Sequence, residues 1–244
     1  MLSKQQVSDR VWVIYGDTKQ EIAKAFIRFQ EYYENEKLRG NINLTVKDVE
    51  AWWDISKQQQ DTDDSYYEYW QGFNLPGSVI YELISNPSFR KSHDETFSVR
   101  FHPEEEQLIK LIKEQPDKEI VAGYYIGLAK NAEHVYDHEV AHALYATNHN
   151  YRSTQINNIA RLPKEIFDNI RKDLVSMGYH SSVILDEIQA YLSSYTETLS
   201  EIFCTDIYTK YTTPFVETFK AYSTFERKTI VIDKVKEQMD KMPL

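Results

Sequence analysis

The 244-residue chain is poor in cysteine and in long apolar runs. Cys204 is its single cysteine, which excludes an internal disulfide and a cysteine-rich zinc site and makes a reducing compartment the simplest expectation. Residues 1–6 contain no apolar segment typical of a signal peptide, and no run approaches the length of a membrane span. We therefore expect a cytoplasmic protein without a membrane partner, although export by a route that needs no signal peptide stays open.

Basic residues are also in short supply. The chain has 28 Lys and Arg against 38 Asp and Glu, which gives a net charge of −10. Most of such a surface repels a phosphate backbone, so we expect no nucleic-acid partner. Hydrophobic residues make up 41% and charged residues 27%, as is typical of a soluble globular protein.

The first half of the chain mixes strand and helix patterns. Residues 11–15 are β-branched and aromatic and predict a strand, whereas the apolar spacing of residues 19–36 predicts a helix, capped by Asp17 or Thr18. Thr45 followed by Asp48 resembles a capping box at the start of another helix. Further expected features are strands at 97–101 and 120–127, a helix from Pro103, a turn-rich segment at 72–77, and either a short helix or a strand at 78–84.

The second half is expected to be almost wholly helical. Its predicted helices cover residues 152–161, 163–177 with a stop at Gly178, about 182–204, and 215–240 after an interruption at Pro214. We predict an α+β fold in a single domain of residues 1–244, with a small mixed sheet in an α+β lobe (1–128) and a mostly helical lobe (129–244).

One motif dominates the sequence at the junction of these lobes. His138, Glu139 and His142 form an HExxH pattern, which is typical of a zinc site on a helix. Residues four apart lie on one helical face, so the two imidazoles can bind one ion, whereas Glu139 is placed to act on a water molecule as a general base. Apolar neighbours from Val140 to Leu144 favour a helix with a buried side, and Asn131 is the expected N-cap.

A catalytic zinc ion usually has three protein ligands and one open position. In the metzincin pattern the third ligand is a histidine six residues after the second, but that position is Asn148 here. His149 comes one residue too late. His134 and His138 form a rival pair, which lacks an adjacent glutamate because Val135 follows His134.

The downstream segment 185–191 resembles the glutamate helix of the gluzincins, HExxH metallopeptidases whose third zinc ligand is a glutamate. The stretches 137–148 and 177–192, with the strand before the first, resemble an uncharacterised group of bacterial HExxH proteins. The N-terminal strand and helix and residues 72–76 resemble the same group. The resemblance implies a zincin-like fold and Glu187 as third ligand, followed by the small Ala190 that lets the two helices approach closely. Asp186 competes for this role, and Glu187 as a plain surface carboxylate is the alternative.

The expected chemistry is cleavage of peptide bonds by a zinc-activated water, with a protein or peptide as substrate. Tyr179 and His180 are the first candidates to stabilise the oxyanion, ahead of Tyr191 and Tyr195. Asp137 or Asp186 is expected to orient a histidine ligand. The alternatives are a zinc-binding interaction protein without peptidase turnover and a metal-free helical protein.

Two expectations concern the substrate. By resemblance to zincins, the strand at 119–127 is expected to form an edge along which a peptide extends. The aromatic cluster from Tyr66 to Trp70 could line a cleft, but we expect it to pack the core of its lobe or a loop lid.

Overall fold

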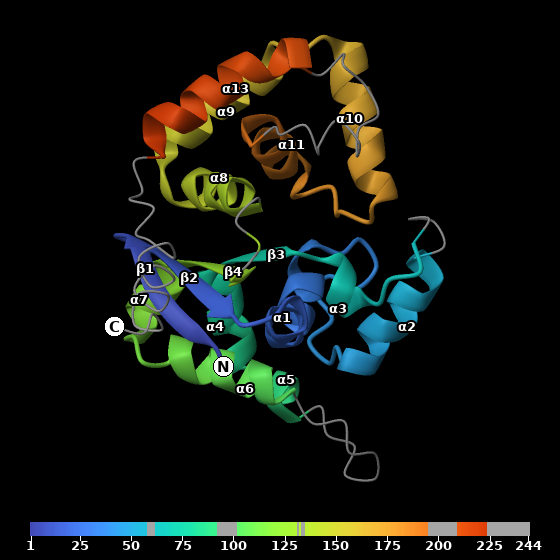
Figure 1. Ribbon diagram of the computed structural model, residues 1–244, viewed down its shortest axis with the longest axis vertical. Helices are drawn as coiled ribbons and strands as arrows, with labels where there is room; N and C mark the ends of the chain where they lie inside the picture. Colours follow the sequence, from blue (N-terminus) through green and yellow to red (C-terminus); the bar gives the residue numbers. More distant parts are fainter. Residues whose placement is uncertain (58–61, 92–101, 131, 133–134, 195–208, 224–244) are drawn as a thin grey trace, which may run out of the picture.

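The computed structural model describes all residues except 58–61, 92–101, 131, 133–134, 195–208 and 224–244 (Figure 1). Four strands form one sheet in the order β1-β2-β4-β3, namely β1 (Ser3–Ser8), β2 (Val11–Gly16), β3 (Gly72–Pro76) and β4 (Tyr124–Ala129). Since β2 and β4 are parallel and the other two pairs are antiparallel, the sheet is mixed. The predicted α+β class and the small mixed sheet in the N-terminal half are confirmed.

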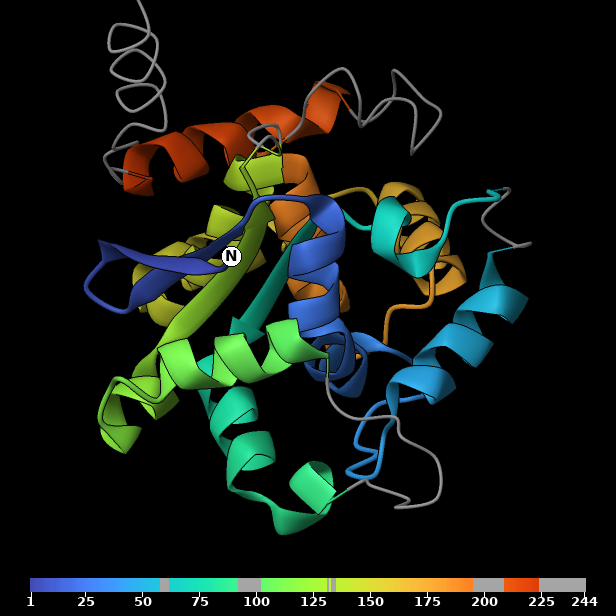
Figure 2. The same cartoon turned by 60° about the horizontal axis from the view of Figure 1, so that its bottom comes forward.

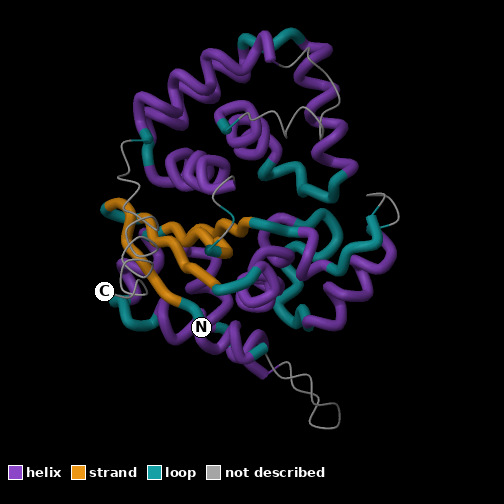
Figure 3. The backbone as a smooth tube through the Cα atoms, viewed as in Figure 1, coloured by secondary structure: helices purple, strands orange, loops and turns teal. Residues whose placement is uncertain are grey.

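Both faces of the sheet are buried, which explains why its central strands are so apolar. Along β2, Trp12 and Ile14 point into one hydrophobic core while Val11 and Val13 point into another. Strand β4 is buried along its whole length between β2 and β3. The sheet therefore separates two layers of helices (Figures 1 and 3).

Helices of the N-terminal half lie on the first side of the sheet, some against the sheet and some against other helices (Figure 2). The Thr18 hydroxyl accepts a hydrogen bond from the backbone N–H of Glu21 and caps α1, while Thr45 and Asp48 form the predicted capping box of α2. These helices are α1 (Lys19–Glu34), α2 (Val46–Ser56), α3 (Tyr66–Tyr69), α4 (Gly77–Ser85), α5 (Pro87–Lys91), α6 (Pro103–Ile112) and α7 (Asp117–Ala122).

Helices of the C-terminal half lie on the opposite face, with α8 next to the sheet (Figure 1). They are α8 (Tyr136–Thr147), α9 (His149–Ala160), α10 (Lys164–Ser176), α11 (Ile184–Ser193) and α13 (Thr209–Tyr222). Gly178 follows α10 with a φ of 99°, a left-handed conformation that glycine adopts without steric cost and that ends the helix as predicted. Among the described helices, none combines the length and the apolar composition that crossing a membrane requires.

Several local predictions were wrong. Residues 120–122 end helix α7 instead of beginning a strand, because a short apolar run fits either structure. The turn-rich segment 72–76 is strand β3, in which Pro76 is tolerated at the last position of an edge strand. Strand β1 was not predicted, and residues 78–84, left open, lie in helix α4.

Two helix boundaries also differ from the predictions. Helix α13 runs through Pro214, and amide side chains of α9 support this turn: Asn158 donates to the carbonyl of Pro214, and Gln155 to that of Phe215. Helix α8 begins at Tyr136 after Val135 and has no side-chain cap, so Asn131 is not its N-cap. The predicted strand at 97–101 and the segments 195–204 and 224–240 of two predicted helices lie outside the described residues.

Candidate metal centre

Helix α8 places the HExxH motif between the sheet and the helical half. Val140, Ala141 and Ala143 are completely buried in the core that α8 shares with β2 and β4. The opposite side of the helix presents His138 and His142 to α11. The apolar flanks of the motif therefore fix the helix on the sheet, and its 3.6-residue period sets the direction of the histidines.

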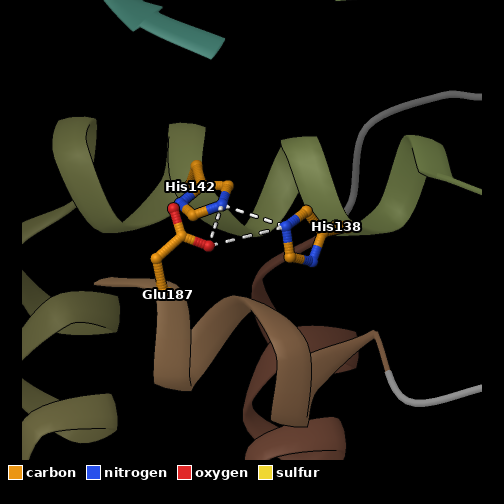
Figure 4. Close-up of side chains that lie close together, drawn as sticks. All are labelled: His138, His142 and Glu187. Atoms are coloured by element: carbon orange, nitrogen blue, oxygen red, sulfur yellow. Dashed lines mark hydrogen bonds and ion pairs between the residues drawn. The ribbon is translucent and has the colours of Figure 1, made fainter. Parts of the chain in front are cut away.

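Glu187 of α11 meets both histidines, as the resemblance to gluzincins implied (Figure 4). The Nε2 atoms of His138 and His142 are 3.2 Å apart, and Glu187 Oε2 lies 3.9 Å from the first and 3.6 Å from the second. Two ligands bound tetrahedrally to one zinc ion at about 2.0–2.1 Å are about 3.3 Å apart. The three ligand atoms thus have nearly the separations that a shared cation requires.

The burial of these atoms supports the same conclusion. Glu187 is 1% exposed, and its Oε2 has no hydrogen-bond partner among the described residues. A buried carboxylate oxygen without a partner is costly, so such an atom is expected to have a ligand. The donor set and its geometry fit a metal ion, and a set of two imidazoles and one carboxylate suits zinc without being specific to it.

A chain of polar side chains begins at Nδ1 of His142, the ring nitrogen that does not face the other two ligands. This nitrogen lies 3.0 Å from Asp186 Oδ1, and the same Asp186 oxygen accepts a hydrogen bond from Gln189 Nε2. Gln189 in turn accepts from the Tyr151 hydroxyl, which accepts from Gln155 Nε2. Asp186, one of the two residues predicted to orient a histidine, thus lies against His142, while Glu187 occupies the third ligand position.

The protonation behaviour of the ligands reflects their charges and burial. Burial, with the neighbouring His142, lowers the pKa of His138 well below its usual value, which leaves the imidazole neutral and able to bind a metal. Burial opposes charge on His142 too, but Asp186 and Glu187 outweigh it and raise the pKa of His142. Burial raises the pKa of Glu187 to about 8, and Asp186 and Glu139 add to this rise. The site therefore favours a positive charge.

Glu139 lies beside the triad and against strand β3. A side chain at Gly72 would begin 2.3 Å from Glu139 Oε1, so only glycine leaves room for this carboxylate. Burial raises the pKa of Glu139 to about 7, which His142 and a hydrogen bond from Asn74 oppose. Glu139 Oε2 has no hydrogen-bond partner among the described residues. The carboxylate is thus held in place and keeps one oxygen available.

The triad and Glu139 open into a cavity of about 350 Å³. Its walls combine acidic and aromatic side chains from four distant segments: Glu31 and Glu34 of α1, Trp52, the segment Tyr69–Asn74, and Tyr179 with Tyr191. The aromatic cluster is divided: Tyr66 packs in the core, as predicted, whereas Tyr69 and Trp70 line the cavity.

The other predicted site residues lie in different places. Tyr179 lines the cavity, and its hydroxyl is 3.5 Å from that of Tyr191. His180 is not among the lining residues, and its Nδ1 contacts Ser182 instead. His149 is exposed at the start of α9 and contacts Ser153. His134 and Tyr195 lie outside the described residues.

The prediction of a substrate-binding edge at 119–127 was wrong. Strand β4 has a partner on each side, so its backbone groups are already paired. Among the described strands, β3 forms the edge beside the cavity, and Gly72, Phe73 and Asn74 line that cavity.

Sequence reasoning missed Glu31, Glu34, Gly72 and Gln189. The sequence does contain a pattern that marks the two glutamates. Ala23, Ile27, Glu31 and Glu34 lie on one stripe of α1 at helical spacing, and charged residues on a buried stripe are unusual outside paired or functional positions. Gly72 matters through Glu139, which is distant in sequence, whereas Gln189 connects the nearby Asp186 with Tyr151 of α9; no local pattern marks either residue.

Comparisons of the chain with models of protein families, with curated proteins and with solved structures find no match. The interpretation of this site therefore depends on its own geometry and chemistry.

Proposed function

We propose that the protein is a zinc-dependent hydrolase that cleaves peptide bonds. The observation that carries this proposal is the convergence of His138, His142 and Glu187, whose ligand atoms lie within 4.8 Å of one another, beside Glu139 in one open cavity. A purely structural metal site has a closed set of four protein ligands and no need for a buried carboxylate at its side. The described residues offer three ligands and a base, which is the division of roles that hydrolysis requires.

The zinc ion would supply Lewis acidity, which lowers the pKa of water toward neutrality and polarises a carbonyl group. Glu139 takes the proton from the water that attacks the peptide carbonyl and delivers it to the leaving amine. Gly72 and Asn74 hold this carboxylate in position. Asp186 fixes the ring of His142, and the ring of Tyr191 packs on that of His138 with their centroids 4.5 Å apart.

Tyr179 is our candidate for stabilising the oxyanion. Burial, followed by the charge of Glu187, raises the pKa of its hydroxyl well above the usual value, so it stays protonated at neutral pH and can donate a hydrogen bond. His180 points to Ser182 and is the weaker candidate of the predicted pair.

The decisive experiment joins metal analysis with a peptide library. Purified wild-type protein should contain about one zinc ion per chain and cleave a subset of the library, and Glu139→Gln should keep the zinc but lose about 10²–10⁴-fold in kcat. Glu165→Gln, an exposed change of the same charge on α10, is the matched control and should cleave like wild type.

Two results would contradict the proposal in different ways. Wild-type protein without bound zinc, after purification and after incubation with zinc, would remove the metal centre. Zinc-loaded protein that cleaves no peptide, in wild type and Glu139→Gln alike, would leave a zinc-binding protein without peptidase turnover.

A further inference from the structure

The cavity contains more negative charge than its metal centre explains. Glu31 and Glu34 of α1 join Glu139 and Glu187 in lining it, and the described lining residues include no Lys or Arg. One divalent ion bound to the two histidines and Glu187 balances only part of this charge. When ionised, the α1 carboxyl groups attract a separate cation to their side of the cavity.

The two α1 glutamates differ in their hydrogen bonds. Both oxygens of Glu31 are engaged, one by the Tyr66 hydroxyl at 2.6 Å and one by Asn35 Nδ2 at 2.5 Å. Glu34 is only 7% exposed, yet a single side-chain hydrogen bond reaches its carboxylate among the described residues, from Gln30 to Oε2. Its second oxygen is the one left for a ligand in the cavity.

The electrostatic surroundings of Glu34 point the same way. Burial raises the pKa of Glu34 well above its usual value, and the charge of Glu187 adds to the rise. A carboxyl group buried among other carboxylates either keeps a proton or loses it to a cation that binds next to it. Buried groups whose pKa is raised in this way are typical of functional sites.

Backbone hydrogen bonds hold the end of α1, which carries Glu34, against the segment before α11. The backbone N–H of His180 donates to the Glu34 carbonyl at 2.7 Å, and the N–H of Glu36 donates to the Gly178 carbonyl at 2.9 Å. These two bonds join the end of α1 to the segment that leads into α11 and so fix the distance between Glu34 and the metal ligands. A charge fixed in this way can select a substrate by the position of its own charge.

Aromatic side chains complete this part of the cavity. Trp52, Tyr69 and Trp70 line it together with Glu34. The faces of such rings attract ammonium and guanidinium groups, and they exclude water that would screen the carboxylate. A buried carboxylate beside aromatic rings suits an organic cation better than a second metal ion, which prefers several oxygen or nitrogen ligands.

We propose that Glu34 determines the specificity of the cavity by selecting peptides that carry a primary ammonium or guanidinium group near the scissile bond. This inference rests on the proposed peptidase function, since it names the substrate class of the same site. The cationic group is either the free N-terminus of the peptide or a Lys or Arg side chain, and the test separates these two sources.

The test uses four peptides of one sequence, which carry a free or an acetylated N-terminus and either lysine or norleucine at one position next to the scissile bond. With zinc-loaded wild-type protein, a cationic peptide should have at least a tenfold higher kcat/KM than its neutral counterpart, and the pair that shows the difference identifies the source. Glu34→Gln and Glu34→Ala should reduce the preference to less than threefold. Glu36→Gln, an exposed change two residues away, should preserve it.

A binding arm keeps the inference testable if no peptide is cleaved, in which case the proposed function fails separately. Calorimetric titration of the same peptides should then show at least tenfold tighter binding of a cationic peptide to wild type, and no such difference in Glu34→Gln. Equal affinities in wild type would overturn the inference, as would an unchanged preference in folded Glu34 variants. Two bound zinc ions in wild type and one in Glu34→Gln would overturn it too, because Glu34 would then be a metal ligand.

Discussion

Buried carboxylates in two regions of this protein differ in whether the chain supplies a cationic partner side chain. Glu105 of α6 is fully buried, and the guanidinium of Arg28 binds both of its oxygens at 2.5–3.2 Å. Arg28 also donates to the carbonyls of Leu44 and Phe89. In the cavity, Glu34, Glu139 and Glu187 are equally hidden, but no lysine or arginine lines it within the described part of the chain.

The difference separates structural from functional charge. Where the chain supplies the counterion, a buried carboxylate fixes how helices pack, as Arg28 and Glu105 join α1 to α6. Where no cationic side chain is present, the carboxyl group either keeps a proton or binds a cation from outside the chain. We therefore propose a bound metal ion and a cationic substrate as the partners of the three cavity carboxylates.

Breaking the Arg28–Glu105 pair should have the largest effect on stability. Glu105→Gln removes the charge that balances Arg28, which cannot lose its proton, so we expect a loss of about 3–5 kcal/mol in the free energy of unfolding. Urea denaturation measures it. The exposed pair of Lys164 and Asp168 is the control, and Asp168→Asn should cost at most about 0.5 kcal/mol. A loss below 1 kcal/mol for Glu105→Gln would show that this pair does not organise the packing.

The stability of the protein should depend on pH through the buried carboxyl groups that line the cavity. Burial raises the pKa of Glu31 from 4.5 to about 7, so folding favours its protonated form. That contribution is complete below about pH 4.5 and disappears as the pH rises through 7. Between pH 5 and 8, Glu31→Gln should lose roughly 2.5 kcal/mol less stability than wild type. Urea denaturation of both proteins in the presence of a chelator tests this, and parallel losses would contradict it.

Removing the third ligand should separate metal binding from folding. Glu187→Gln keeps the volume of the side chain but removes its charge. Loss of a residue that only orients a ligand weakens metal binding by about 10–100-fold, so for the loss of a ligand we expect a decrease in zinc affinity of at least about 100-fold. The metal-free variant should be no less stable than metal-free wild type, because a buried carboxylate with a raised pKa disappears. Competition with a chromophoric chelator measures the affinity, and an unchanged value would exclude Glu187 as a ligand.

The smallest effect on zinc affinity is expected for Gln189, which contacts Asp186 instead of a proposed metal ligand. Gln189→Leu removes the hydrogen bond that positions Asp186 and leaves both histidines and Glu187 in place. We expect about a 10–100-fold loss of zinc affinity. In the cobalt-substituted protein the visible absorption spectrum should change as the geometry of His142 alters. Gln155→Leu, two hydrogen bonds further from the metal, is the matched control and should have a smaller effect on both measurements.

The sequence by itself determined the parts of this protein that depend on local periodicity. The four-residue spacing of His138 and His142 places them on one side of a helix wherever that helix lies, and the apolar residues between them bury the other side. Thr18 and Thr45 mark the starts of α1 and α2 because a cap is a contact within three residues.

The resemblance to gluzincins implied Glu187, but only the tertiary structure decided between Glu187 and Asp186 and placed the other groups around the histidines. It placed Glu187 on the metal side of α11 with Asp186 behind His142, made β3 instead of β4 the strand at the cavity edge, and brought Glu34 of α1 across from α11. These outcomes depend on the pairing of segments that are 44 to more than 140 residues apart. Such pairing follows from the packing of whole helices and strands on two hydrophobic cores, which no short stretch of the chain encodes.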